Sequence, residues 1–168
     1  AGSCKTFEVV LPELLGDAWC VTSRDRAAEC YKRIVQKRGD QPRILRKLII
    51  LAKANGQKEN EYGLLERLSR SERRRVELAK IYFRLAELKI ILESDKDGAI
   101  NLAIQSLEYD RNHFVSALFA AELLQETGRP QDAISLLDRI LKSPKINLTL
   151  KARSKINQLV GDIWSHSL

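Results

Sequence analysis

The sequence contains no methionine, only four prolines and eight glycines, and no long apolar run. Because proline and glycine are the residues that interrupt helices, long helices meet few obstacles here. No apolar stretch approaches the roughly 18 residues that a membrane-spanning helix needs, and no basic segment followed by an apolar core marks a secretory signal. We therefore expect a cytoplasmic protein without membrane insertion. The missing methionine indicates a processed chain or an excised fragment, which could have lost an anchor or another domain.

Cysteine and histidine are also scarce, with three cysteines and two histidines in 168 residues. Cys4, Cys20 and Cys30 show no CxxC spacing, and an odd count without a framework is typical of a reducing compartment. We expect Cys20 and Cys30 to be buried helical thiols. His113 and His166 have no serine, aspartate or cysteine at a spacing that would form a catalytic group. The sequence therefore predicts no metal, no cofactor and no enzymatic activity.

Charged residues, by contrast, are plentiful and biased in sign. They make up 30% of the chain beside 44% hydrophobic residues, which is the balance of an ordinary globular protein. Lysine and arginine number 29 against 22 acidic residues, so the net charge is +7. A positive balance favours anionic partners through long-range attraction but does not specify a fold.

The clearest helical pattern lies in "FVSALFAAELLQETGRPQDAISLLDRILKSP", residues 114–144. Two apolar helical stretches flank a turn at Gly128, which can adopt the left-handed conformation that closes a helix. Small residues at Ala121 and Ala133 would let the two helices approach closely. This hairpin resembles the tetratricopeptide repeat, a 34-residue helix–turn–helix unit. In that resemblance Ala121 and Ala133 match the small positions, Gly128 matches the turn glycine, and Pro144 falls near the closing proline.

The same hairpin recurs along the chain. Ala133, Ala99, Glu61 and Ala27 occupy matching places in successive second helices, at spacings of 34, 38 and 34 residues. Gly56 holds the same turn place as the later turn glycine. A further resemblance, of "RVELAKIYFRLA" to a repeat of bacterial tetratricopeptide proteins of envelope biogenesis, covers one hairpin. A non-repeating helical bundle with accidental spacing is the structural alternative.

These patterns predict an all-α fold, a right-handed α-α superhelix of about four tetratricopeptide-like repeats and a C-terminal helix. We expect a single domain over residues 1–168, with repeats at 7–40, 41–74, 75–112 and 113–147 and a capping or truncated fifth-repeat helix at 148–168. The first helices of the repeats are expected near 7–20, 43–54, 75–93 and 114–127. The second helices are expected near 24–37, 59–70, 97–109 and 131–142, followed by a ninth helix near 148–166.

A scaffold that binds a protein or peptide is the function that this architecture implies, because the first helices of such repeats line a concave face. Basic residues lie outside the apolar stripes of these helices and could bind an acidic segment or a terminal carboxylate. The predicted groove residues are Arg43, Arg46, Lys53, Lys80 and Arg84. The alternative interpretation is a solvated helix face on which Glu77 and Glu87 neutralise neighbouring cations at helical spacing.

An RNA-binding helical repeat is the rival function. Its contact surface would be the densest basic run of the sequence, formed by Arg70, Arg73, Arg74 and Arg75. Few aromatic stacking partners stand near this run in the sequence, and Ser71–Glu72 is typical of a helix start. We therefore favour a protein partner over nucleic acid.

Two six-residue segments, "LLGDAW" at 14–19 and "LVGDIW" at 159–164, nearly repeat each other. In the repeat pattern Gly16 and Gly161 take the small position of a first helix, where a second helix passes close by. Trp19 and Trp164 are then expected to fill the hairpin beside that contact. The second segment would open a fifth repeat, and self-association through this terminal helix is a further expectation.

Overall fold

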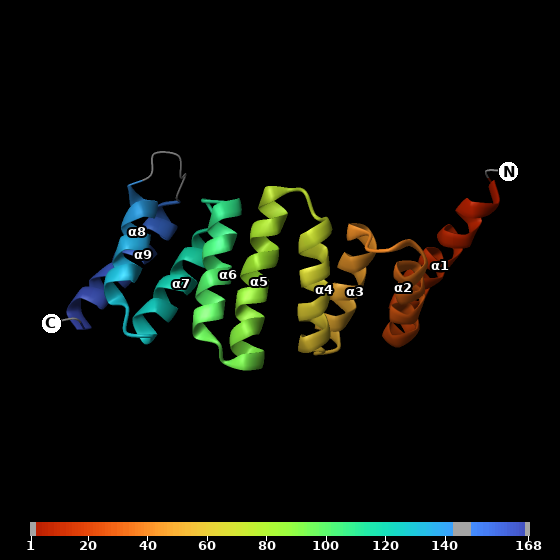
Figure 1. Cartoon of the computed structure of the whole chain (residues 1–168), viewed down its shortest axis with the longest axis horizontal. Helices are drawn as coiled ribbons and strands as arrows, with labels where there is room; N and C mark the ends of the chain where they lie inside the picture. The colour runs from red at the N-terminus through yellow and green to blue at the C-terminus, as the bar shows by residue number, and fades with distance from the viewer. Residues whose placement is uncertain (1–2, 143–148, 167–168) are drawn as a thin grey trace. The chain divides into compact units, whose positions relative to one another are not determined.

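The computed structural model describes residues 3–142 and 149–166, and within these ranges it contains helices and no strand (Figure 1). The chain forms two compact units, Ala1–Glu72 and Arg73–Leu168, which are described separately. The helices are α1 (Ser3–Thr22), α2 (Arg24–Arg38), α3 (Pro42–Ala54), α4 (Lys58–Ser71), α5 (Arg75–Glu93), α6 (Lys96–Tyr109), α7 (Phe114–Glu126), α8 (Pro130–Leu141) and α9 (Leu150–His166). The predicted helices are therefore present, with α1 longer than expected.

The first unit consists of two hairpins, α1–α2 and α3–α4, and α2 packs on α3. Ala27 is fully buried at the small position of α2, as the repeat pattern predicts. Gly16 of α1 lies against the buried ring of Tyr31, and a Cβ at this glycine would stand 2.6 Å from Tyr31 Cε1. The close approach predicted at Gly16 is therefore present, and only a residue without a side chain fits there.

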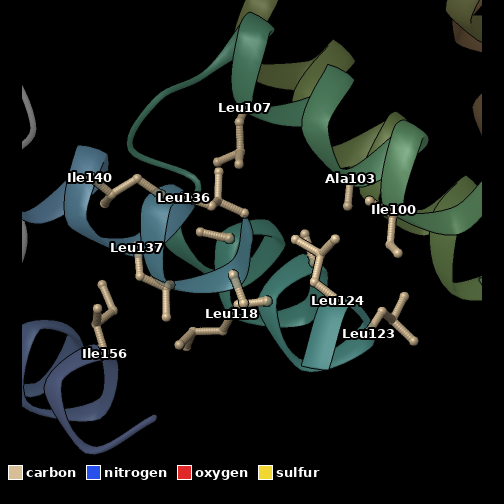
Figure 2. Close-up of a cluster of buried hydrophobic side chains, with 14 of the residues drawn as sticks. Ile100, Ala103, Leu107, Leu118, Leu123, Leu124, Leu136, Leu137, Ile140 and Ile156 are labelled. Atoms are coloured by element: carbon tan, nitrogen blue, oxygen red, sulfur yellow. The ribbon is translucent and has the colours of Figure 1, made fainter. Parts of the chain in front are cut away.

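The second unit contains the hairpins α5–α6 and α7–α8, and α9 packs on α8 and α7. Its core is an apolar cluster in which the small residues of the repeat pattern, Ala99, Ala121 and Ala133, are fully buried. Figure 2 shows leucine and isoleucine side chains of α6, α7 and α8 meeting in this cluster, with Ile156 of α9 beside Leu137. Side chains of this size supply most of the favourable free energy of folding by leaving water.

The turns follow the chemistry that the sequence predicts. Gly56 and Gly128 have φ values of +68° and +74°, and Ser94, which replaces a turn glycine, also adopts the left-handed conformation with φ +54°. Asp95 caps α6 by accepting a hydrogen bond of 2.8 Å from the amide of Gly98. Pro144, the expected closing proline, lies outside the described residues.

Several local expectations are wrong. Ser71 does not begin a helix: it is the last residue of α4, where its hydroxyl bonds to the carbonyls of Arg67 and Leu68. Cys20 is exposed and Cys30 half-buried, so neither is the buried thiol that was expected. The packing predicted for the two similar six-residue segments is absent at the second one, residues 159–164. Outside its own helix backbone, a Cβ at Gly161 would meet no atom of the described residues within 4 Å, and Trp164 is 51% exposed. Trp19 is half-buried under the guanidinium of Arg26.

Candidate functional site

The predicted groove residues of the first unit lie on α3, and two of its cations face α1. Lys47 reaches Glu13 Oε1 at 2.8 Å and Asp17 Oδ1 at 2.6 Å. Arg43, one turn earlier on α3, contacts Glu13 through Nε at 3.0 Å, while its side chain remains 74% exposed. Residues four apart share one face of a helix, which is why both cations meet the same stripe of α1.

The buried Tyr31 contacts both members of the Lys47–Asp17 ion pair. The hydroxyl of Tyr31 donates to Asp17 Oδ1 at 2.5 Å, and Lys47 Nζ stands 5.3 Å from the centre of the Tyr31 ring. Hydrogen bonds from Lys47 and Tyr31 lower the pKa of Asp17, whereas burial and the bond to Asp17 raise the pKa of Tyr31. Burial alone would lower the pKa of Lys47, but the bonds to Asp17 and Glu13 outweigh it and raise that pKa. These charges are therefore held in fixed positions.

The remaining α3 cations lie farther round the helix. Arg46 forms an ion pair with Glu72, whose side chain is only 5% exposed, and the bond holds the end of α4 against α3. Lys53 is exposed in the last turn of α3. Between them lies Ile50, which is 66% exposed. We call the outward stripe formed by Arg43, Arg46, Ile50 and Lys53 the α3 face.

Lys80 and Arg84 lie on α5, in the second unit. Lys80 pairs with Glu77 at 3.0 Å and Arg84 pairs with Glu87 at 3.0 Å, each three residues away on the same helix. This is the neutralisation that the helical spacing predicts. Pairs of this kind on an exposed helix contribute a few tenths of a kcal/mol.

The basic run is divided between the two units. Arg70 is exposed on α4, and Arg73 and Arg74 are exposed at the start of the second unit. Arg75 donates to the carbonyls of Glu108 at 2.6 Å and Tyr109 at 3.3 Å, and so caps the C-terminal end of α6. The fold also supplies aromatic neighbours that the sequence does not show near the run. The Tyr109 ring lies 5.8 Å from the Arg75 guanidinium and stacks on Tyr82 at 5.2 Å.

A hydrogen-bonded network of polar groups crosses the second unit, and no sequence motif indicates it. Ser106 donates to the carbonyl of Ala79 at 2.8 Å, so its contact with Ser116 at 2.8 Å uses the proton of Ser116. Ser116 therefore accepts the third bond, 2.7 Å long, from Nδ1 of His113. Each hydroxyl has a single proton, which fixes the neutral His113 as the Nδ1–H tautomer. Both serines are fully buried.

The hydrogen-bonded network that ends at His113 makes the stability of the second unit depend on pH. Burial lowers the pKa of His113 below its ordinary value of 6.5, an effect to which the Lys80 charge adds and which the Asp110 charge opposes. The folded state then binds the proton less well than the unfolded state, so stability is fully present above pH ~7.5 and falls as the pH drops below ~6.5. We expect an NMR titration midpoint for His113 below 6.5 and, in the His113→Gln variant, a weaker loss of stability between pH 7.5 and 5. A midpoint above 6.5 would contradict the burial argument.

Two kinds of feature are absent from the described part of the chain, residues 3–142 and 149–166. No group of three or more His, Cys, Asp or Glu side chains there could hold a metal ion. None of the helices in it is both long enough and apolar enough to span a bilayer.

Comparison with known proteins places the fold. No family model matches the sequence, and no curated protein does. Two structures of MamA are similar, one with a TM-score of 0.65 and 14% identity over 95% of this chain and 82% of that chain, the other with a TM-score of 0.64 and 18% identity over 89% and 79%. YrrB, a TPR protein with an unusual peptide-binding site, matches with a TM-score of 0.66 and 10% identity over 99% of this chain and 84% of its own. The chain therefore has the all-helical fold of tetratricopeptide-repeat proteins.

Proposed function

We propose that this chain is a protein-interaction scaffold that binds a segment of a partner protein along the first helices of its repeats. The fold supports this, because stacked helical repeats offer extended surfaces for binding. YrrB, which shares the fold, is a TPR protein with a peptide-binding site. Within the first unit the α3 face is the surface best suited to such a segment.

The observation that carries this assignment is the position of Arg43. Its side chain is 74% exposed, and the contact with Glu13 is made through Nε, at 3.0 Å. A ligand carboxylate can bind the terminal nitrogens bidentately. Ile50 offers an apolar contact one to two turns farther along, so the expected ligand carries an acidic residue and an apolar residue.

The carboxylates already paired with these cations do not prevent such binding. The Arg43 side chain is mostly exposed, and Glu13 also pairs with Lys47, so a ligand carboxylate can bind Arg43 while Glu13 keeps a cationic partner. The ion pair of Arg46 differs, because its partner Glu72 is nearly buried. A negative charge placed at residue 46 would face the Glu72 carboxylate with no cation between them. Lys80 and Arg84, on α5 of the second unit, stay a prediction from the sequence.

Charge reversal at Arg43 tests this function. We expect Arg43→Glu to weaken binding of an acidic twelve-residue peptide of alternating glutamate and leucine by about tenfold, the equivalent of one lost charge-assisted contact. The peptide with glutamine in place of glutamate should bind weakly to both proteins. Fluorescence anisotropy at low and high salt measures the affinities.

The matched control is Arg33→Glu, which makes the same charge change at an exposed position of α2. It alters the net charge of the protein equally but lies on a second helix. If Arg33→Glu weakens binding as much as Arg43→Glu, the effect is general electrostatics and the α3 face is not the site. Equal affinity of Arg43→Glu and the unmodified protein would also refute it.

RNA binding through Arg70, Arg73, Arg74 and Arg75 is the second candidate, favoured by the stacked rings of Tyr82 and Tyr109 next to Arg75. We rank it lower, because Arg75 already uses its guanidinium on the carbonyls of α6. A salt titration with single-stranded RNA separates the two functions. Affinity that falls steeply with salt would support RNA binding, and no binding at low salt would remove it.

A further inference from the structure

A trough runs between α2 and α4 of the first unit, with α3 as its floor. It consists of two adjoining hollows of about 270 and 310 Å³ that share Lys32, Leu48 and Asn60. Leu48 and Leu51 line the floor. At about 100° per residue, they lie on the side of α3 away from Arg46 and Lys53, so the trough is separate from the α3 face.

The walls of the trough are continuous stripes along two helices. On α2 the lining residues are Asp25, Glu29, Lys32 and Gln36, and on α4 they include Asn60, Leu64 and Arg67. Spacings of three and four residues place each set on one helix face. The stripe on α2 covers 12 residues, whose 11 rises of about 1.5 Å make about 16 Å, the length of about five residues in an extended chain.

Side-chain bonds hold the walls in place at both ends. Asn55 donates to Asp25 at 3.5 Å where α2 and α4 begin, and Arg67 Nε contacts the carboxylate oxygens of Asp40 at 3.1 and 3.2 Å where they end. The floor side chain Leu48 is only 4% exposed and is fixed by the core. A trough held open in this way binds a ligand without a further ordering cost of its own.

The lining has the chemistry of a peptide site. Four carboxamides line it, from Gln36, Asn55, Gln57 and Asn60, and Asn60 Nδ2 donates one of its two hydrogens to Gln57 Oε1 at 3.1 Å. A carboxamide can donate to a main-chain carbonyl and accept from a main-chain N–H at the same time. The charges differ along the length, with Asp25 and Glu29 toward one end and Lys32 and Arg67 toward the other.

We propose that this trough is a second binding site, which takes an extended segment of about five residues from a partner protein. The carboxamides bind its main chain, an apolar side chain lies on Leu48, and an acidic side chain points to Lys32 and Arg67. A helical segment is disfavoured because its N–H and C=O groups are already paired within the helix, which leaves the carboxamides nothing to bind. RNA is disfavoured because its phosphates would meet Asp25 and Glu29.

The test begins with a random octapeptide library displayed on phage and selected against the whole chain. We expect selected peptides to combine an acidic and an aliphatic residue, and synthetic copies to lose at least tenfold in affinity for Lys32→Glu. Lys32 pairs with exposed Glu29, three residues away on the same helix, so we expect the substitution to leave the fold intact, which circular dichroism verifies. Ala28→Phe, which fills the trough from α2, should block the same peptides.

The controls separate this site from the α3 face. Lys37→Glu makes the same charge change at an exposed position of α2 outside the trough and should leave affinity within twofold, as should Arg43→Glu. Methylation of one central main-chain nitrogen of the peptide should weaken binding about tenfold, since it removes a main-chain donor.

Four results would overturn the assignment: a selection without binders, peptides indifferent to both Lys32→Glu and Ala28→Phe, peptides that become helical on binding, or displacement of bound peptide by single-stranded RNA. Peptides that respond only to Arg43→Glu would refute the trough and leave the proposed function standing. Conversely, peptides that respond only to the trough variants would support this site and leave the α3 face to its own test with Arg43→Glu.

Discussion

Replacing Gly16 with alanine is expected to destabilise the first unit by about 1–2 kcal/mol, although alanine is the better helix former. The added Cβ would stand 2.6 Å from Cε1 and 2.9 Å from Cζ of Tyr31, closer than van der Waals contact allows. The Tyr31 ring is fully buried and its hydroxyl is bonded to Asp17, so it has little room to move aside. Overpacking of this kind costs about 1–3 kcal/mol, which exceeds the 0.5–1 kcal/mol that alanine contributes inside a helix.

Gly161 provides the matched control, because it occupies the corresponding place in the second copy of the six-residue segment. Nothing lies within 4 Å of a Cβ there, so Gly161→Ala should stabilise α9 by about 0.5–1 kcal/mol. The two tryptophans allow each unit to be followed by fluorescence in denaturant. Trp19 reports on the first unit in a Trp164→Phe background, and Trp164 reports on the second in a Trp19→Phe background. The same sign of effect at both glycines would contradict the contact with Tyr31.

Truncation of Leu137 to alanine should have the largest effect on the second unit, a loss of about 2–5 kcal/mol. Leu137 is fully buried in the cluster of Figure 2, next to Ile156, so the change leaves a cavity between α8 and α9. Trp164 fluorescence in the Trp19→Phe background measures the change in the free energy of unfolding.

Leu150→Ala is the control for this truncation. It removes the same atoms from a side chain that is 89% exposed, so its effect should stay within about 0.5 kcal/mol. A loss of less than 1 kcal/mol for Leu137→Ala, or similar losses for both variants, would show that α8 does not anchor this core as the structure indicates.

The fold could be predicted because its signals are local and repeated. The spacing of Ala27, Ala99 and Ala133 places one small residue in each of three second helices, and all three are fully buried. The pairs Glu77–Lys80 and Glu87–Arg84 also follow from helical spacing alone. By contrast, nothing in "LVGDIW" tells whether another helix packs against Gly161, and the echo of Gly16 was therefore misleading.

The contacts between repeats were missed, although the period contains a signal for them. Lys47 meets Glu13, 34 residues earlier, and meets Asp17, 30 residues earlier. Arg75 reaches the carbonyl of Tyr109, 34 residues later, within its own hairpin. Residues separated by one period, or by one period less a helical turn, lie on neighbouring elements. A search for opposite charges at these separations would have paired the α3 cations with α1. The trough could not be found this way, because it depends on where side chains leave space.

The hydrogen-bonded chain from His113 to Ala79 has a consequence for how the repeats recognise one another during folding. Every second helix presents nearly the same apolar stripe, so docking of the wrong hairpin is the natural error of a repeat protein. At the place of Ser106, however, the other second helices carry Ile34, Leu68 and Ile140, all buried. Among the second helices, only α6 carries a hydroxyl at this place. That hydroxyl donates a hydrogen bond to the Ala79 carbonyl and accepts one from Ser116. The buried hydroxyl of Ser106 thus distinguishes α6, the correct neighbour of α5, from the other second helices.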